Sequence, residues 1–183
     1  IMAIKRIGVL TAGGDAPGMN SCIRAVVRYA LNNKLEVIGI FRGWYGLINE
    51  ELKLLDHRAV SGIINLGGTM LKTARCPEFK TEEGRERAFL TVKKNAIDAL
   101  VVIGGDGSFR AAHEFYKKYK VPCIAIPASI DNDINGIDLT IGMDTAINTA
   151  IYALDNIRDT ATSMERIFVV EVMGRSSGYI ALQ

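Results

Sequence analysis

The sequence is poor in proline and cysteine and contains no long hydrophobic run. Four prolines in 183 residues, without a Gly-X-Y repeat, exclude a collagen-like chain and a low-complexity disordered one. Cys22, Cys76 and Cys123 form neither a CxxC pair nor a histidine-spaced pattern, which argues against zinc and disulfides and favours a reducing cytoplasm. No apolar run reaches the roughly 18 residues of a membrane-spanning helix, and residues 1–6 lack the features of a signal peptide.

A large excess of charge of one sign is also lacking. The 22 Lys and Arg residues against 20 Asp and Glu give +2 at pH 7, which indicates no nucleic-acid partner. A phosphorylated small molecule stays compatible with this balance, because it needs only local charge. A hydrophobic fraction of 49% and a length of 183 residues are typical of one soluble globular domain, or one and a fraction.

Short apolar runs alternate with helical patterns along the chain. The runs that predict strands lie at residues 7–10, 35–41, 99–103, 121–126 and 166–173. Apolar spacing predicts helices at residues 23–31, 109–119 and 144–162, and a polar helix is expected at residues 81–95. Residues 43–73 are interrupted by glycine and give no clear assignment. The alternation predicts an α/β fold, a Rossmann-like three-layer sandwich with a mainly parallel sheet.

Glycine is abundant, with 18 residues where an average near 7% would give about 13. Three predicted strands end in glycine-rich or acidic loops, at residues 11–18, 104–108 and 127–133. In open α/β sheets ligands bind beyond the carboxyl ends of the strands, and glycine lets the backbone approach a phosphate. Neither GxxxxGK[ST] nor GxGxxG is present, so a tight strand–helix turn is the alternative for each loop. Two glycine loops that also carry Asp15 and Asp106 favour the phosphate site.

Acidic side chains in these loops are candidates for metal ligands and for a general base. Asp106 lies between Gly105 and Gly107, where a carboxylate would repel a phosphate unless a cation lay between them. Mg²⁺ typically takes one or two carboxylates plus phosphate oxygens, so Asp106 is a candidate ligand, with a helix N-cap as the alternative. Asp131 and Asp133 flank one asparagine. They can divide the work of base and metal ligand in phosphoryl transfer, or simply form a turn.

Arginines near the loops are candidate anion ligands, since the planar guanidinium matches phosphate oxygens. Arg75, Arg166 and Arg175 lie beside predicted strands and loops. Arg24 and Arg28 are one helical turn apart and share a face, so they could bind an anion together. Each arginine taken alone is also compatible with an ordinary solvated surface residue.

Taken together, the motifs resemble the N-terminal part of the bacterial ATP-dependent 6-phosphofructokinases. The resemblance runs from Lys5 to Leu182 and rests on six segments that occur in one order. They are IGVLTAGGDAPGMN at 7–20, GGT at 67–69, TARCPEF at 73–79, VIGGDGS at 102–108, SIDND at 129–133 and EVMGR at 171–175.

The resemblance implies the phosphofructokinase fold, present here in part. Residues 1–142 would form an incomplete ATP-binding α/β domain, and residues 143–183 would begin the fructose 6-phosphate-binding domain. The implied enzyme is a phosphotransferase that moves the γ-phosphoryl group of ATP to the 1-hydroxyl of fructose 6-phosphate in glycolysis. It would use Mg²⁺, act as a cytoplasmic homotetramer under allosteric control, and bind neither nucleic acid nor membrane.

The resemblance also implies residue roles. Asp131 would be the base, and Asp106 and Asp133 would serve Mg²⁺. The residues implied at ATP are Gly14, Arg75, Cys76, Gly105, Asp106, Gly107 and Ser108. Those implied at the sugar phosphate are Ser129, Asp131, Arg166, Met173, Gly174 and Arg175, with Arg166 reaching a neighbouring subunit. Those implied at an effector nucleotide between subunits are Arg24, Arg28 and Arg158.

Departures from the family pattern leave alternatives open. Pyrophosphate-dependent relatives commonly carry an acid at the position of Gly107 and a lysine at that of Ala128, so this chain favours ATP. His57 and Gly62 replace effector residues of one well-known form, so activation by ADP is undecided. Another kinase with a Gly-Gly-Asp-Gly loop and a non-catalytic regulatory subunit are the remaining alternatives. Because family members are nearly twice as long, residues 1–183 alone are expected to be inactive, and activity of this segment by itself would contradict that.

Overall fold

The structure is a computed structural model that describes residues 4–183; residues 1–3, which open the segment considered for a signal peptide, lie outside it. Five strands and seven helices are assigned in this range. They are β1 (Arg6–Ala12), α1 (Met19–Asn32), β2 (Glu36–Ile40), α2 (Trp44–Ile48), β3 (Leu52–Leu55), the 3₁₀ helix η1 (Pro77–Lys80), α3 (Glu82–Lys94), β4 (Ala99–Gly104), α4 (Asp106–Tyr119), β5 (Cys123–Pro127), α5 (Met143–Met164) and α6 (Tyr179–Leu182).

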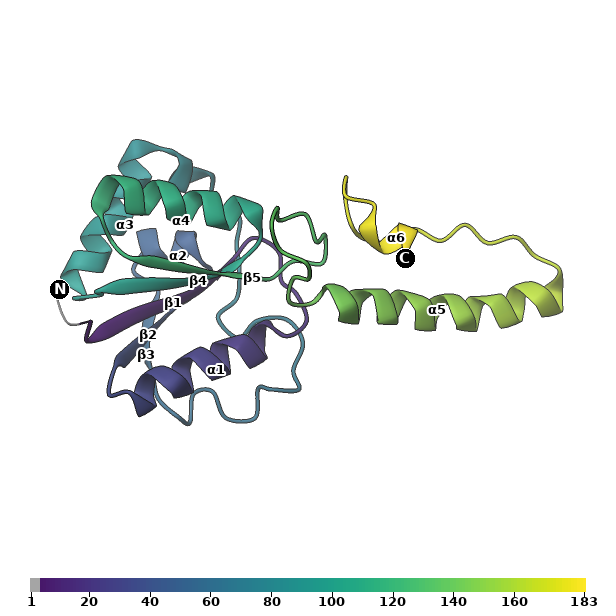
Figure 1. The fold of residues 1–183 in the computed structure, drawn as a ribbon, viewed down its shortest axis with the longest axis horizontal. Coiled ribbons are helices and arrows are strands. Elements are labelled where there is room, and N and C mark those ends of the chain that lie inside the picture. The colour runs from purple at the N-terminus through teal and green to yellow at the C-terminus, as the bar shows by residue number, and fades with distance from the viewer. Residues whose placement is uncertain (1–3) are drawn as a thin grey trace.

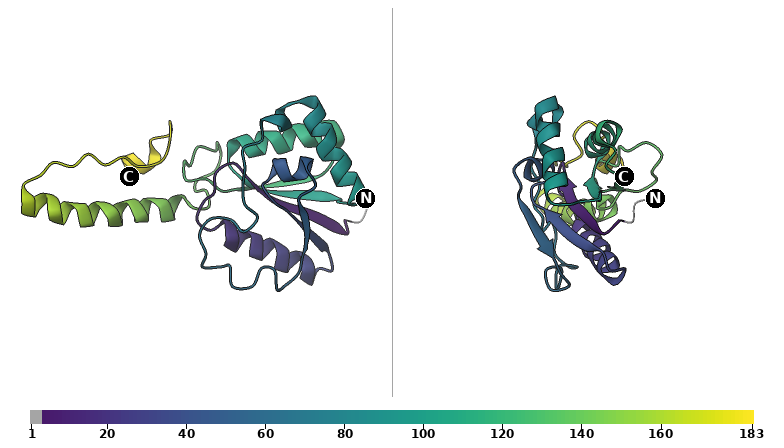
Figure 2. Two further views of the ribbon diagram at one scale, coloured as in Figure 1. Left: turned by 180° about the vertical axis from the view of Figure 1, so that it is seen from behind. Right: turned by 90° about the vertical axis from the view of Figure 1, so that its left-hand side faces the viewer.

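The strands form one sheet in the order β3-β2-β1-β4-β5. All neighbouring pairs are parallel except β2 and β3. Figure 1 shows α1 against one face of the sheet and α2, α3 and α4 against the other, and Figure 2 shows the same layers from two further directions. The predicted three-layer sandwich with a mainly parallel sheet is therefore confirmed.

Two apolar cores explain why the strands are continuously hydrophobic. Side chains alternate across a strand, so Ile7 and Val9 of β1 pack with α1, while Leu10 packs with the helices on the opposite face. Val9 and Leu10 are both fully buried. A strand covered on both faces needs no polar positions, which is the pattern that identified β1 and β4 from sequence.

Two parts of the chain differ from the sequence prediction. The unassigned region before residue 73 contains α2 and the antiparallel strand β3, both too short for a clear periodicity. The strand predicted at residues 166–173 is wrong, because this segment is extended but belongs to no strand. Ile167 and Val169 are each 97% exposed, and within residues 4–183 no backbone pairs with theirs. A strand needs a hydrogen-bonded neighbour as well as a suitable sequence.

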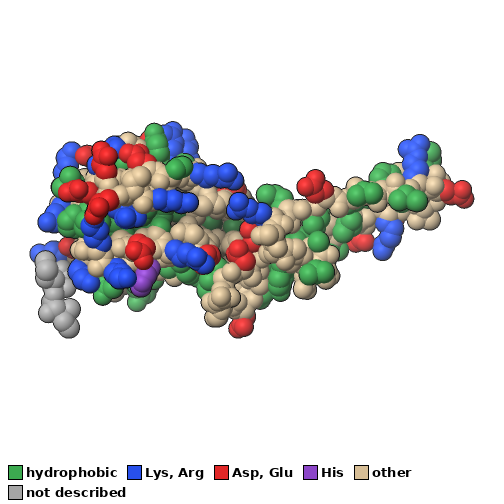
Figure 3. All heavy atoms as spheres, turned by 90° about the horizontal axis from the view of Figure 1, so that it is seen from above, with side chains coloured by type: hydrophobic (Ala, Val, Ile, Leu, Met, Phe, Trp, Pro, Cys, Tyr) green, Lys and Arg blue, Asp and Glu red, His purple; other side chains and the backbone are tan. Residues whose placement is uncertain are grey.

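The last third of the chain leaves the sandwich as an arm. Figure 1 shows α5 running away from the sheet and the segment after it returning toward α6. Met143, at the root of the arm, is the buried residue of α5. Figure 3 shows hydrophobic side chains along this arm, with acidic and basic side chains among them and at its far end. Among the described residues, no helix combines the length and hydrophobicity that a bilayer crossing requires.

The Asp98 carboxylate joins the starts of β1 and β4, and it generates a prediction about acid stability. It accepts hydrogen bonds from the backbone N–H groups of Lys5 (2.7 Å) and Arg6 (2.9 Å), and these bonds lower its pKa. A carboxyl with a lowered pKa stabilises the fold above its ordinary pKa and loses that contribution as pH falls through the lowered value. Asp98→Asn should therefore lower the melting temperature at pH 7, and the difference from wild type should shrink as pH is lowered.

Melting temperatures measured from pH 7 down to pH 3 test this expectation. Glu114→Gln is the control, because Glu114 is exposed on α4 and makes no hydrogen bond or ion pair with the described residues. A difference between wild type and Asp98→Asn that stays constant with pH would contradict the assigned role.

Candidate functional site

The candidate site lies where the parallel strands β1, β4 and β5 end together. The register places Ala12 opposite Gly104, and Gly104 opposite Pro127, so the three loops that follow begin at the same level. Figure 1 shows these loops gathered between the sheet and the root of α5. The sequence predicted ligand binding from these three loops, and the structure brings them to one edge of the sheet.

Hydroxyl groups fasten the loops to one another. The Ser108 hydroxyl, which is buried, donates to Ala12 O at 2.9 Å. The Thr73 hydroxyl donates to Gly13 O at 2.6 Å, and the Thr11 and Thr69 hydroxyls lie 2.9 Å apart. The glycine turn after β1 is thus fixed from two sides. The Ser108 hydroxyl already donates its hydrogen to Ala12 O. A direct contact of Ser108 with ATP stays a prediction.

The glycines of these loops fall into two kinds. At Gly104 an added Cβ would lie 2.4 Å from Ala12 O, so the fold itself requires glycine there. At Gly14, Gly67 and Gly107 an added Cβ would meet nothing within 4 Å, and none of the three has a positive φ. The described chain therefore gives no reason for glycine at these three positions. Open space beside bare backbone is what a phosphate group could occupy.

A second cluster joins the loop after β5 to the segment after α5. Burial, and next the charge of Asp133, raise the pKa of Asp131, while the charge of Arg175 acts against them. The structure thus brings together three side chains that the sequence selected separately. Within residues 4–183 no protein group donates a hydrogen bond to the Asp131 carboxylate, so it is free to accept a proton from a bound hydroxyl.

The two clusters adjoin each other. A Cβ added at Gly105 would lie 3.7 Å from the Ser129 Cβ, so the glycine loop before α4 touches the loop that carries Asp131. Groups from both loops could therefore act on one pair of substrates. A hollow of about 380 Å³ lies elsewhere, beside Phe41, Arg42 and Leu52, and contains none of the predicted site residues.

Asp106 is the first residue of α4, and the structure excludes one alternative for its role, that of a helix N-cap. Gly105 is the N-cap and no side chain caps this helix, so the interpretation of Asp106 as an N-cap is wrong. Its Oδ2 lies 2.8 Å from Nε of Arg110, one turn along the helix. Sequence reasoning missed Arg110, although the spacing of four residues signals such a pair. A metal at Asp106 would compete with this arginine.

The acidic groups fit Mg²⁺ by their chemistry. Carboxylate oxygens are the hard ligands that this ion prefers. The described part of the chain contains no group of three or more His, Cys, Asp or Glu side chains that could hold a metal ion. A shell of one or two carboxylates completed by phosphate oxygens is therefore the kind of site that Asp106 and Asp133 could form with a nucleotide.

Arg75 and Cys76 follow the loop that Thr73 ties to the glycine turn. Arg75 is exposed, and Cys76 is the N-cap of η1 and packs against the core beside α3. Burial raises the pKa of the Cys76 thiol, which favours its neutral form.

Asn20, a buried asparagine that was not predicted as important from the sequence, fixes the loop at residues 66–70. Asn20 is 3% exposed and lies on the apolar face of α1. Its amide donates to Leu66 O at 3.0 Å and Gly67 O at 3.2 Å, and its Oδ1 accepts from Met70 N at 2.7 Å. A polar residue in register with Ile23 and Val27 was the signal available.

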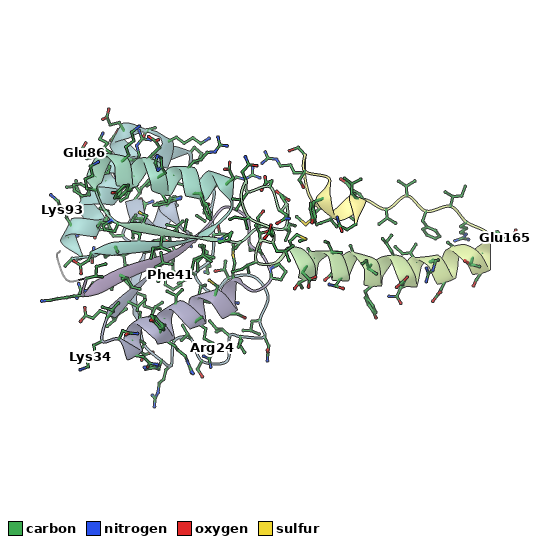
Figure 4. The ribbon with its side chains drawn as sticks, in the orientation of Figure 1. Arg24, Lys34, Phe41, Glu86, Lys93 and Glu165 are labelled. Atoms are coloured by element: carbon green, nitrogen blue, oxygen red, sulfur yellow. The ribbon has the colours of Figure 1, made fainter. Side chains whose placement is uncertain are left out.

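Several predicted residues are not brought to this cluster. Arg166 follows the far end of α5, whose 22 residues extend about 33 Å. Arg158, also on α5, pairs with Asp155 at 3.0 Å. Figure 4 labels Arg24 on α1 and Glu165 at the distal end of α5, which lie on different parts of the molecule. One copy of this chain therefore does not gather Arg24, Arg28 and Arg158, or Arg166 and Asp131, into a single site.

Met173, Gly174 and Arg175 lie in the returning segment. Met173 is 75% exposed, and Gly174 is buried with φ of 133°, a conformation that favours glycine. This glycine has a backbone requirement, unlike Gly14 and Gly107. It places Arg175 where its charge reaches Asp131.

Comparison with known proteins identifies relatives of this chain. A family model described as phosphofructokinase matches residues 6–183. The chain is 59% identical over 179 residues to the ATP-dependent 6-phosphofructokinase 2 of Bacteroides thetaiotaomicron, covering 98% of this chain and 55% of that protein. It is 56% identical over 179 residues to the ATP-dependent 6-phosphofructokinase of Thermotoga petrophila, covering 98% and 56%. The chain thus spans little more than half the length of these relatives.

Solved structures share the fold. Phosphofructokinase from Saccharomyces cerevisiae superposes with a TM-score of 0.93 at 38% identity, over 97% of this chain and 27% of that one. A pyrophosphate-dependent phosphofructokinase from Marinobacter aquaeolei gives 0.83 at 24% identity, over 97% and 48%, which is evidence for the fold alone. Matched by the family model from residue 6 to residue 183 and folded like solved members, the chain belongs to the phosphofructokinase family.

Proposed function

We propose that the protein containing this chain is an ATP-dependent 6-phosphofructokinase. It would transfer the γ-phosphoryl group of ATP to the 1-hydroxyl of fructose 6-phosphate and give fructose 1,6-bisphosphate. The observation that carries the proposal is the contact between the glycine loop before α4 and the loop of Asp131, which sets bare glycine backbone next to the loop of a carboxylate that accepts no hydrogen bond from the described residues. The names of relatives that are 56–59% identical support it.

In this proposal Asp131 accepts the proton of the 1-hydroxyl as the phosphoryl group arrives. Partial burial and a neighbouring acid make this carboxylate more basic than an ordinary aspartate, which suits a general base. Arg175 would bind the sugar phosphate and limit the repulsion between Asp131 and Asp133. Asp106 and Asp133 would hold Mg²⁺, which when bound neutralises charge on the phosphates.

The remaining assignments are part of the same proposal. Residues 1–142 would form the ATP-binding domain and residues 143–183 would begin the sugar-binding domain. ATP would be bound by Gly14, Arg75, Cys76, Gly105, Gly107 and Ser108. The sugar phosphate would be bound by Ser129, Met173, Gly174 and Arg175, and by Arg166 from a neighbouring subunit. Arg24, Arg28 and Arg158 would bind an effector nucleotide between subunits of a cytoplasmic homotetramer.

The choice of ATP over pyrophosphate is supported by Gly107 and Ala128. The space beside Gly107 is open, whereas an acid at this position would bring negative charge close to the phosphates. Ala128 is 2% exposed and packs in the core beside α1, so it contributes no charge toward the site. Neither position carries a charged side chain, and the space beside Gly107 is open to a nucleotide.

One prediction of the proposed function concerns the base and the phosphoryl donor. In the full-length enzyme, Asp131→Asn should lower kcat by about 100- to 10,000-fold, because it removes the proton acceptor. The KM for ATP should change little, since Asp131 is assigned to the sugar. A coupled assay with ATP and, separately, pyrophosphate measures both, with Glu114→Gln as the control. Near-normal turnover of Asp131→Asn would remove Asp131 as the base, and preference for pyrophosphate would overturn the choice of donor.

Another prediction separates the two kinds of glycine. Gly107→Ala should leave the melting temperature nearly unchanged, because an added methyl meets open space, but should raise the KM for ATP. Gly104→Ala should lower the melting temperature sharply, since its Cβ would lie 2.4 Å from Ala12 O. Thermal unfolding and ATP titration of both variants distinguish them. If Gly107→Ala bound ATP like wild type, phosphate binding at this loop would be excluded.

A further inference from the structure

The loop that carries Asp131 is closed on itself by one asparagine and one threonine. Asn132 Oδ1 accepts a hydrogen bond from Thr140 N at 3.0 Å, and its amide donates to Asp138 O at 3.1 Å. The Thr140 hydroxyl donates to Ser129 O at 2.5 Å. The hydroxyl has one hydrogen, so its 3.2 Å contact with Asn132 Oδ1 adds no second donation. Hydrogen bonds from these two side chains thus cross-link the two halves of the loop.

The base of the same loop is fixed by the backbone. Ala128 and Ile141 form a parallel bridge, with Ser129 N donating to Ile141 O at 3.1 Å and Ile141 N donating to Pro127 O at 3.0 Å. The Asp131 N–H donates to the Ser129 hydroxyl oxygen at 3.1 Å. Asp131 therefore lies between two anchored points, the base of the loop at Ser129 and the side chain of Asn132.

The backbone conformation at Asn132 adds a second constraint. Its φ is 48°, in the left-handed region that asparagine adopts more readily than most residues. This residue separates Asp131 from Asp133, so its φ and ψ determine how the two carboxylates point relative to each other. Since the two acids repel, a loop without the cross-links would relax toward a wider separation.

We propose that Asn132 and Thr140 are positioning residues, which hold the Asp131 and Asp133 carboxylates in the arrangement required for phosphoryl transfer. The inference rests on the proposed function for its catalytic meaning and on the hydrogen bonds above for its geometry. Thr140 is 5% exposed, and the polar groups of both side chains are engaged within the loop, so neither residue needs to touch a substrate to act. Displacement of a reacting group by about 1 Å can cost about 100-fold in rate.

Two pairs of variants in the full-length enzyme test the proposal. Asn132→Gly keeps the freedom to adopt positive φ and removes only the side-chain bonds, whereas Asn132→Ala removes both. Thr140→Val removes the hydroxyl donation to Ser129 O, and Thr140→Ser restores it. We expect kcat to fall about 10- to 100-fold in Asn132→Gly and Thr140→Val, further in Asn132→Ala, and to recover in Thr140→Ser. The KM for ATP should stay within about twofold of wild type.

Asn33→Gly is the matched control, because this asparagine also bonds a backbone oxygen, Tyr29 O at 2.8 Å, but lies at the opposite end of α1. Wild-type kcat in Asn132→Gly and Thr140→Val would overturn the proposal. A loss of kcat that follows the unfolded fraction, without recovery in Thr140→Ser, would also overturn it and leave a purely structural role.

Amide hydrogen exchange keeps this test separate from that of the proposed function. The N–H of Thr140 should exchange slowly in wild type and at least about tenfold faster in Asn132→Gly, whichever reaction the protein catalyses. Unchanged protection in the variant would show that the cross-link does not hold the loop. Changed protection in an enzyme inactive toward fructose 6-phosphate would instead reject the proposed function while the geometry stands.

Discussion

The close approach of β1 and β4 at their carboxyl ends is the constraint on which the rest of the structure depends. Ala12 and Gly104 are paired in the sheet, and the Ser108 hydroxyl bonds Ala12 O from the first turn of α4. Only glycine fits at position 104, because any Cβ would collide with that oxygen. This contact sets two glycine loops side by side at one level. The loop after β5, the next strand along, then brings the acids to the same edge.

The three-layer sandwich could be predicted from the sequence because the central strands of its sheet are buried on both faces. Apolar runs and helical patterns located β1, β2, β4, β5, α1, α3, α4 and α5 with small errors at the ends. The missed elements are short, and one of them, the strand β3, also depends on a partner. β3 has only four residues and exists because β2 offers an edge, whereas the apolar segment at residues 166–173 finds no such edge within residues 4–183. Local pattern describes a suitable strand, but pairing decides whether it forms.

The residues of the candidate site likewise fall into those that the sequence predicted and those that it did not. Residues proposed to face a ligand, such as Asp106, Asp131 and Arg175, stand in recognisable motifs because few residue types can do their chemistry. The residues that hold them, such as Asn20 and Thr140, are common types whose hydrogen-bond partners lie far along the chain or across a loop. Their role depends on three-dimensional proximity, so no spacing rule reveals it. Asn20 could be suspected only as a polar residue on an apolar helix face.

The exposed edge of β5 has a consequence for how this chain behaves in solution. Ile124 on that edge strand is 66% exposed, and Ile167 and Val169 in the extended segment are almost fully exposed. An unpaired edge and an apolar extended segment are each templates for intermolecular β-pairing. Residues 4–183 in isolation therefore carry both halves of an aggregation contact, and their colloidal stability depends on whatever covers these two surfaces.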